Sequence, residues 1–322
     1  MDCIDSAFIM HWTNCVDKLT LNILTNFPGL NMQISEFQNV LILIAIAGFA
    51  LMEFVTRRYQ TTVNATANDT KLELFMFISL VALTQPLVIL ATQNMGEAWF
   101  SQWQGIWADW PWWAMFAVLL LGDDLTQYLW HRASHSPLLW PLHRAHHSAQ
   151  YMSVRMTFRN NFFYYLMMPG LWIAGALLFL GFGGWVYAAY LTLKLTIILG
   201  AHCSWRWDEP LYKIRALHPL MWLLERTIST PATHWAHHAL TNKDGIGHYT
   251  GNFGNMLFLW DIIFGTAHIT RKYPDHIGLM DDRIHGQEHW AHQMFYPLAH
   301  SKRADSALRF GGTIYDENKN SN

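Results

Sequence analysis

Apolar runs separated by short polar stretches dominate the first two thirds of the chain. Four of these runs have about the 20 residues that a helix needs to cross a bilayer, at 37–55, 72–91, 162–180 and 182–200. A shorter run at 114–121 leads into Asp123 and Asp124, and carboxylates at membrane depth are costly and usually functional. The pattern predicts an all-α, polytopic membrane protein with four to five transmembrane helices.

The composition supports this prediction. Hydrophobic residues make up 52% of the chain and charged residues only 14%, whereas about 25% of the residues of a soluble domain are charged. Six tryptophans lie within 96–113, and tryptophan is enriched at membrane–water interfaces. The formal net charge of −2 indicates no nucleic-acid partner. The three cysteines form neither a paired framework nor a zinc ribbon.

The basic residues predict how the helices are oriented. Five spans would place 57–71, 131–161 and 201–322 on one side of the membrane, and these segments hold 19 of the 21 Lys and Arg residues. Basic residues gather in cytosolic loops. The sequence therefore predicts an integral membrane protein with a cytosolic helical cap, in the bacterial inner membrane or the endoplasmic reticulum.

The polar segments on that side carry a spaced set of histidines. The spacing H-x-x-x-H occurs at 131–135, and H-x-x-H-H occurs at 143–147 and again at 234–238. Residues three or four apart leave the same face of a helix, and neutral imidazole is a common metal ligand. Together with the histidine that follows the 182–200 run, nine side chains are candidate metal ligands and catalytic residues: His131, His135, His143, His146, His147, His202, His234, His237 and His238.

Nine ligands suit two metal ions, because a single zinc takes only three or four protein ligands. Zinc hydrolases add a general base in H-E-x-x-H, and soluble di-iron bundles use Glu-x-x-His; neither pattern occurs in this chain. We therefore expect an all-nitrogen dimetal site in the helical cap. Asp124 falls on one helical stripe with Tyr128 and His131, so it is expected to accept a hydrogen bond from a ligand imidazole or otherwise support the site. Solvation of a helix near the interface is the alternative role for Asp124.

These motifs resemble those of the fatty acid hydroxylase superfamily, a membrane non-haem di-iron group that includes sterol desaturases and C4-sterol methyl oxidases. The family order is H-x-x-x-H, H-x-x-H-H, a membrane hairpin, a lone His and a second H-x-x-H-H. The likeness extends through 139–148, 230–238, 251–255 and 259–266. Two positions depart from the family pattern: Ser204 stands where Asn is common, and Phe253 replaces a frequent Tyr.

The resemblance implies a domain organisation and a reaction. The parts would be a lead-in at 1–34, transmembrane helices with the tryptophan-rich segment at 35–114, a catalytic domain at 115–270 and a cytosolic extension and tail at 271–322. Two iron ions would activate the co-substrate O2, and hydroxylation or desaturation of a sterol, fatty acyl or related membrane lipid would follow. Zinc would be an alternative occupant after purification.

The electrons for such a reaction would come from a separate donor of the ferredoxin or cytochrome b5 type with its reductase, because the sequence shows no flavin, haem or iron–sulfur motif. A metal-dependent membrane lipid hydrolase is the main alternative, and it would need a carboxylate base such as Asp124, Asp208 or Glu209. A metal transporter or haem protein is a third class, although such proteins tend to place single histidines within spans. His218 and His248 are further histidines that could lie near the metals.

Overall fold

The computed structural model describes residues 32–303 and 306–309, and within this part the chain is helical with no β-strand. Two isolated bridges, Ile228 with Leu257 and Ala239 with Ile277, tie loops together. The all-α prediction is therefore confirmed. Most of the expected lead-in at 1–34, and the end of the expected tail, lie outside the described residues.

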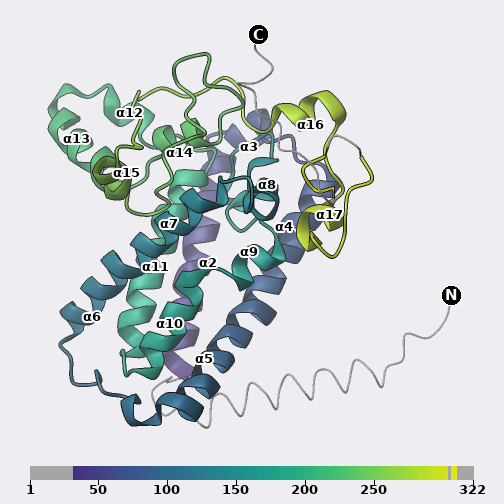
Figure 1. The fold of residues 1–322 in the computed structure, drawn as a ribbon. Helices are drawn as coiled ribbons and strands as arrows, with labels where there is room; N and C mark the ends of the chain where they lie inside the picture. Colours follow the sequence, from purple (N-terminus) through teal and green to yellow (C-terminus); the bar gives the residue numbers. More distant parts are fainter. Residues whose placement is uncertain (1–31, 304–305, 310–322) are drawn as a thin grey trace.

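Five long helical stretches form the body of the molecule (Figure 1). They are α2 (Met32–Val55); α4 (Ala67–Ser79) continuing through the π-helix η1 (Leu80–Thr84) into α5 (Gln85–Phe100); α6 (Trp112–Val118) continuing through the π-helix η3 (Leu119–Asp123) into α7 (Asp124–Ser134); α10 (Pro169–Phe179); and α11 (Gly184–His202). In this bundle α11 packs against α2, and α10 packs against α5.

Shorter helices form a cap at one end of the bundle. They are α3 (Arg58–Thr62), α8 (Trp140–His147), α9 (Phe162–Leu166), α12 (Glu209–Tyr212), α13 (His218–Thr227), α14 (Pro231–His237), α15 (Leu259–Phe264), α16 (Met280–His285) and α17 (Trp290–Phe295). The 3₁₀ turns η2 (Ser101–Trp103), η4 (Val154–Met156) and η5 (Arg215–Leu217) complete the assignment.

Four helical segments are long and apolar enough to cross a membrane: Gln38–Val55, Ala67–Trp103, Phe162–Phe179 and Gly184–His202. Large apolar side chains face outward on these helices, including Ile44 and Phe54 on α2, which are 61% and 62% exposed. Such surfaces are stable only against lipid. The protein is therefore an integral membrane protein.

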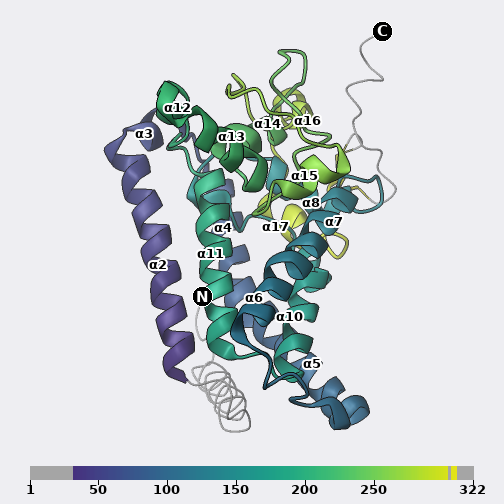
Figure 2. The ribbon, with the colours of Figure 1, turned by 90° about the vertical axis from the view of Figure 1, so that its left-hand side faces the viewer.

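The expected short span at 114–121 is not one of these four segments. It forms part of the continuous helical stretch from α6 to α7, which runs along the bundle beside α10 and α11 (Figures 1 and 2). The two carboxylates of Asp123 and Asp124 make this stretch less apolar. Both turn into the protein, where the residues are 5% and 2% exposed.

The two ends of the bundle differ in character. The end of α5 and the start of α6 lie at the end of the bundle opposite the cap (Figure 1). Four tryptophans in this part of the chain are more than half exposed, as expected for an interfacial belt: Trp99, Trp103, Trp112 and Trp113. The ends of α7, α11 and α14 meet α8 at the other end (Figure 1). The histidine-bearing segments therefore share one side of the bundle. That this side is cytosolic stays a prediction from the basic residues.

Glu53 joins the first helix to the cap. Its carboxylate, 1% exposed, accepts hydrogen bonds from the Ser153 hydroxyl at 2.7 Å, the Val154 N–H at 2.9 Å and the Ser204 N–H at 2.7 Å. Ser204 directly follows the segment that carries His202. One carboxylate at the end of α2 therefore fixes two loops beside the histidine cluster.

We predict that Glu53→Ala destabilises the protein by about 3 kcal/mol or more, because three buried donors lose a charged acceptor. The measurement is the thermal unfolding midpoint in mild detergent. Glu97→Ala on α5 is the control, since its exposed carboxylate can be removed at a cost within about 0.5 kcal/mol. Equal midpoints for the two variants would show that Glu53 does not anchor these loops.

Candidate metal centre

All nine candidate histidines come together in the structure, at or near the C-terminal ends of four helices. His131 lies in the last turn of α7, and His135 caps that helix. His143, His146 and His147 are on α8; His202 ends α11; His234 and His237 are on α14, which His238 caps. The C-terminal end of a helix carries partial negative charge. Four helices therefore direct a field that favours a cation toward one place.

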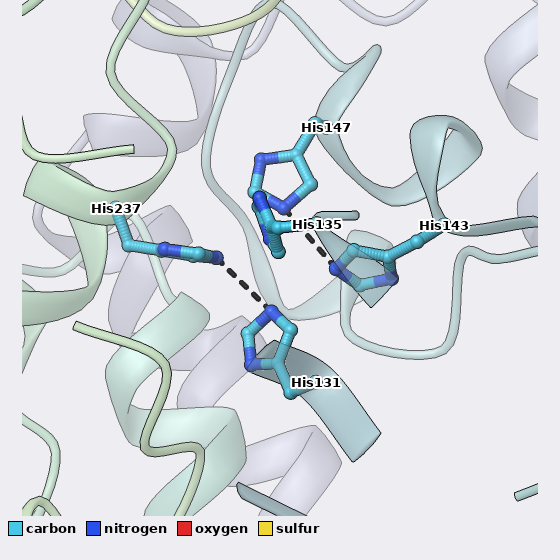
Figure 3. Close-up of side chains that lie close together, drawn as sticks. All are labelled: His131, His135, His143, His147 and His237. Atoms are coloured by element: carbon cyan, nitrogen blue, oxygen red, sulfur yellow. Dashed lines mark hydrogen bonds between the residues drawn. The ribbon is translucent and has the colours of Figure 1, made fainter. Parts of the chain in front are cut away.

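The ring nitrogens form two groups, and within each group they lie within 4.8 Å of one another. The first group is His131, His135, His143, His147 and His237, whose rings converge from α7, α8 and α14 (Figure 3). The second group is His146, His202, His234 and His238. Each group has the size and chemistry of a metal site. That these nine side chains bind metal stays a prediction.

Backbone carbonyls fix the tautomer of four of these rings. The Nδ1–H groups donate to Phe253 O from His131 at 2.6 Å, to Arg159 O from His146 at 3.0 Å, to Ile198 O from His202 at 2.8 Å and to Gly251 O from His237 at 2.7 Å. A neutral imidazole that donates from Nδ1 has a lone pair on Nε2. The free nitrogen of each ring therefore points into the cluster.

The Nε2 atoms of these four rings face each other in two pairs, and neither nitrogen of a pair carries a proton. The Nε2 atoms of His131 and His237 are 3.0 Å apart, and those of His146 and His202 are 3.3 Å apart. Both rings of each pair already donate through Nδ1, so neither Nε2 carries hydrogen. Apposed acceptors repel unless a cation lies among them. The residues present therefore fit a metal ion in each group.

Burial keeps the imidazoles neutral. Removal from water lowers the pKa of His131 to about 4. For the other cap histidines, removal from water and the charge of neighbouring imidazoles together hold the pKa well below its usual range: His135, His143, His146, His147, His234, His237 and His238. Metal binding needs this deprotonated form. The site is therefore in its ligand form at neutral pH.

The loop at 251–258 supplies two of the orienting carbonyls, and carboxylates hold it. Asp261 accepts from Phe253 N–H at 2.9 Å and Gly254 N–H at 2.7 Å. Asp124 accepts from Leu257 N–H at 3.1 Å and from the Trp260 indole at 3.0 Å. Asp124 thus bonds to this loop and to Trp260, and the expected hydrogen bond from a ligand imidazole is not found among the described residues. That Asp124 supports the site through the loop stays a prediction.

Arg159 organises the second group. Its carbonyl accepts from His146, while its guanidinium, fully buried, binds Asp69, donates to Ala145 O at 2.7 Å and donates to Ser148 at 2.6 Å. The sequence reasoning missed Arg159, Asp261 and Glu53. A signal was available for Glu53, because it is a lone acid at the end of an apolar run, and for Asp261, because it lies within the family-like segment 259–266.

His218 and His248, the two further candidate histidines, lie apart from both groups. His218 is exposed and contacts Tyr212 O at 3.0 Å, and His248 packs against His268 with ring centroids 5.0 Å apart. Asp208 is buried and hydrogen-bonds to Tyr273 and to Ala232 N–H at 2.9 Å. Among the described residues, neither His218 nor His248 belongs to either of the two histidine groups.

A cavity of about 430 Å³ extends from the cluster into the bundle. His143, His146 and His202 line one part of it, so it reaches both groups. Most of its wall is apolar and comes from α2, η1, α10 and α11, with Ile42, Leu80, Ala174 and Leu195 as examples. An apolar molecule in this cavity would lie beside both histidine groups.

The amino-acid sequence was compared with those of known protein families. The family model described as Fatty acid hydroxylase matches residues 116–266, a stretch that contains all nine histidines. This part of the chain is similar to the fatty acid hydroxylase family. The resemblance seen in the histidine spacing is thereby confirmed.

Curated relatives that the chain is similar to include alkylglycerol monooxygenases. The protein of Homo sapiens is 30% identical over 160 residues, which cover 49% of this chain and 31% of that protein. The protein of Danio rerio is 28% identical over 158 residues, covering 49% and 30%. The chain thus aligns with about a third of the length of these relatives. No solved structure matches it.

We predict that Asp261→Asn lowers metal affinity about 10- to 100-fold, as loss of partners that orient metal ligands typically does. In the variant an amide NH2 would face the N–H group of Phe253 or Gly254, and the hydrogen bond that holds this loop would be lost. The loop carbonyls that orient His131 and His237 would then be free to move. Metal per chain is measured at limiting metal concentration. Asp244→Asn is the control, because Asp244 is exposed and accepts from Ile246 and Gly247 N–H in a separate loop. Unchanged occupancy in Asp261→Asn would contradict the prediction.

Proposed function

We propose that this protein is a membrane non-haem di-iron oxygenase that inserts oxygen into a C–H bond of a lipid. One observation carries the proposal: two all-histidine groups with apposed Nε2 lone pairs adjoin a single apolar cavity in a membrane bundle. The family match and the monooxygenase relatives support oxygen chemistry and favour hydroxylation over desaturation.

The nine histidines would hold two iron ions, five ligands around one and four around the other. Iron, unlike zinc, changes oxidation state, so the pair would supply the electrons and the Lewis acidity that activate O2. In the hydroxylation, one O2, two electrons and two protons convert one C–H bond into an alcohol and form one water. The two electrons come from a separate reduced donor that reaches the cap.

The protein itself positions the lipid and keeps water away. Phe253 packs its ring against His131, His135 and His237, with centroids 5.8, 5.1 and 5.6 Å apart. Tyr164 stacks on His143 at 5.0 Å. These rings form a dry shell around the first group. Because the cavity wall includes both α2 and α4–η1 residues such as Ile42 and Phe77, we infer that the lipid enters sideways from the bilayer between these helices.

Metal content and O2 uptake test the proposal. Iron-loaded protein in mild detergent, given a reductant and membrane lipid extract, should hold two irons per chain and consume O2 only with lipid. His146→Ala with His237→Ala should abolish both, since each group loses a ligand. His218→Ala with His276→Ala, both exposed, is the matched control. One tightly bound zinc with no redox response to O2 would overturn the oxygenase and favour the membrane lipid hydrolase.

Filling the cavity should block turnover without removing metal. Ala174 is buried on α10 and lines the cavity, so Ala174→Phe is expected to lower lipid-dependent O2 uptake at least tenfold at unchanged iron content. Ile44→Phe, on the lipid-facing side of α2, should leave uptake near that of the parent. Equal rates in both variants would show that the substrate does not use this cavity.

A further inference from the structure

A buried ion pair lies in the same cavity, away from the histidines. Lys194 Nζ on α11 is 2.6 Å from Asp123 Oδ2 at the end of η3, and Tyr190 donates to the same oxygen at 2.6 Å. The side chains of Lys194 and Asp123 are 9% and 6% exposed. Both residues and Tyr190 line the cavity that His143 and His202 reach.

This pair has unused hydrogen-bonding capacity. Lys194 has three N–H donors, and its recorded hydrogen bond uses one. Both bonds to the Asp123 carboxylate go to Oδ2, so Oδ1 receives no recorded hydrogen bond. A Cβ on Gly170 would lie 2.5 Å from this Oδ1, so the glycine allows the carboxylate to pack closely against α10. Buried charges normally have their hydrogen bonds filled, and the open positions face a cavity.

The chemistry of the open positions defines a ligand group. A hydroxyl accepts from Lys194 Nζ and donates to Asp123 Oδ1 at the same time. The pair carries no net charge, so a neutral hydroxyl keeps the cavity neutral, whereas a carboxylate would add an uncompensated buried charge. An alkane would leave both positions unfilled.

We propose that Asp123, Lys194 and Tyr190 form a recognition site for the hydroxyl group of a neutral lipid bound in the cavity. Lys194 precedes His202 by eight residues, which is about 12 Å along an α-helix. The bound lipid therefore has its hydroxyl in the bundle and an apolar portion that spans this separation to the histidines. This inference rests on the proposed function in taking the cavity as the lipid site, and it assigns the group that selects the lipid.

Equilibrium binding of radiolabelled hexadecan-1-ol, hexadecane and hexadecanoate to the iron-loaded protein in detergent tests this site. The parent should bind the alcohol about tenfold or more tightly than the alkane and the carboxylate, as expected for hydrogen bonds to charged groups. Asp123→Leu with Lys194→Met removes both charges together, so no unpaired charge remains. This double variant should bind alcohol and alkane alike, with alkane binding and iron content unchanged.

Gly170→Ala is a second, milder variant, because its methyl group displaces Oδ1 while the Lys194 contact to Oδ2 can stay. It should weaken alcohol binding severalfold and leave alkane binding in place. A structural role for the pair predicts instead that all ligands lose affinity together or that none does, and either result overturns the proposal. Alcohol selectivity without O2 uptake would sink the oxygenase alone, and O2 uptake without selectivity would sink the hydroxyl site alone.

Discussion

Four imidazoles whose Nε2 lone pairs face each other in two pairs, within a cluster of nine, impose the main constraint on this protein. Neutral rings such as His131 and His237, 3.0 Å apart at Nε2, repel when both protons are on Nδ1. The structure holds them there with carbonyls that receive those protons and with helix ends that favour positive charge. A metal cation among these nitrogens would replace this repulsion with attraction.

The surrounding frame consists of charged groups that bridge segments distant in sequence. Arg159 binds Asp69 of α4, and Arg144 lies 2.6 Å from both Asp281 and Asp282 in the chain after the family segment. Breaking a buried pair of this kind typically costs about 3–5 kcal/mol. The first pair connects the segment that follows α8 to α4, and the second connects α8 to the C-terminal part of the cap. The histidines are thus held by long-range contacts and not by their own short helices.

The cavity connects the membrane helices with the histidine cluster. Its wall is apolar where it follows the helices, and it meets both histidine groups at one end. Under the proposed function, a lipid would enter this space from the hydrocarbon layer, and its C–H bonds would lie beside the two histidine groups. The Asp123–Lys194 pair interrupts the apolar wall, and ionisable residues at membrane depth are costly and usually functional.

The sequence by itself predicted the membrane helices, the nine histidines that come together and the family resemblance. Each of these depends on local pattern: length of apolar runs, helical spacing and a motif order that is very specific. The tertiary structure decided how the nine rings divide into groups of five and four, because neighbours such as His146 and His147 join different groups. It also decided which carbonyls orient the rings and that Asp123 and Lys194, 71 residues apart, share one cavity. Such relations depend on how helices pack in space, and sequence spacing does not encode them.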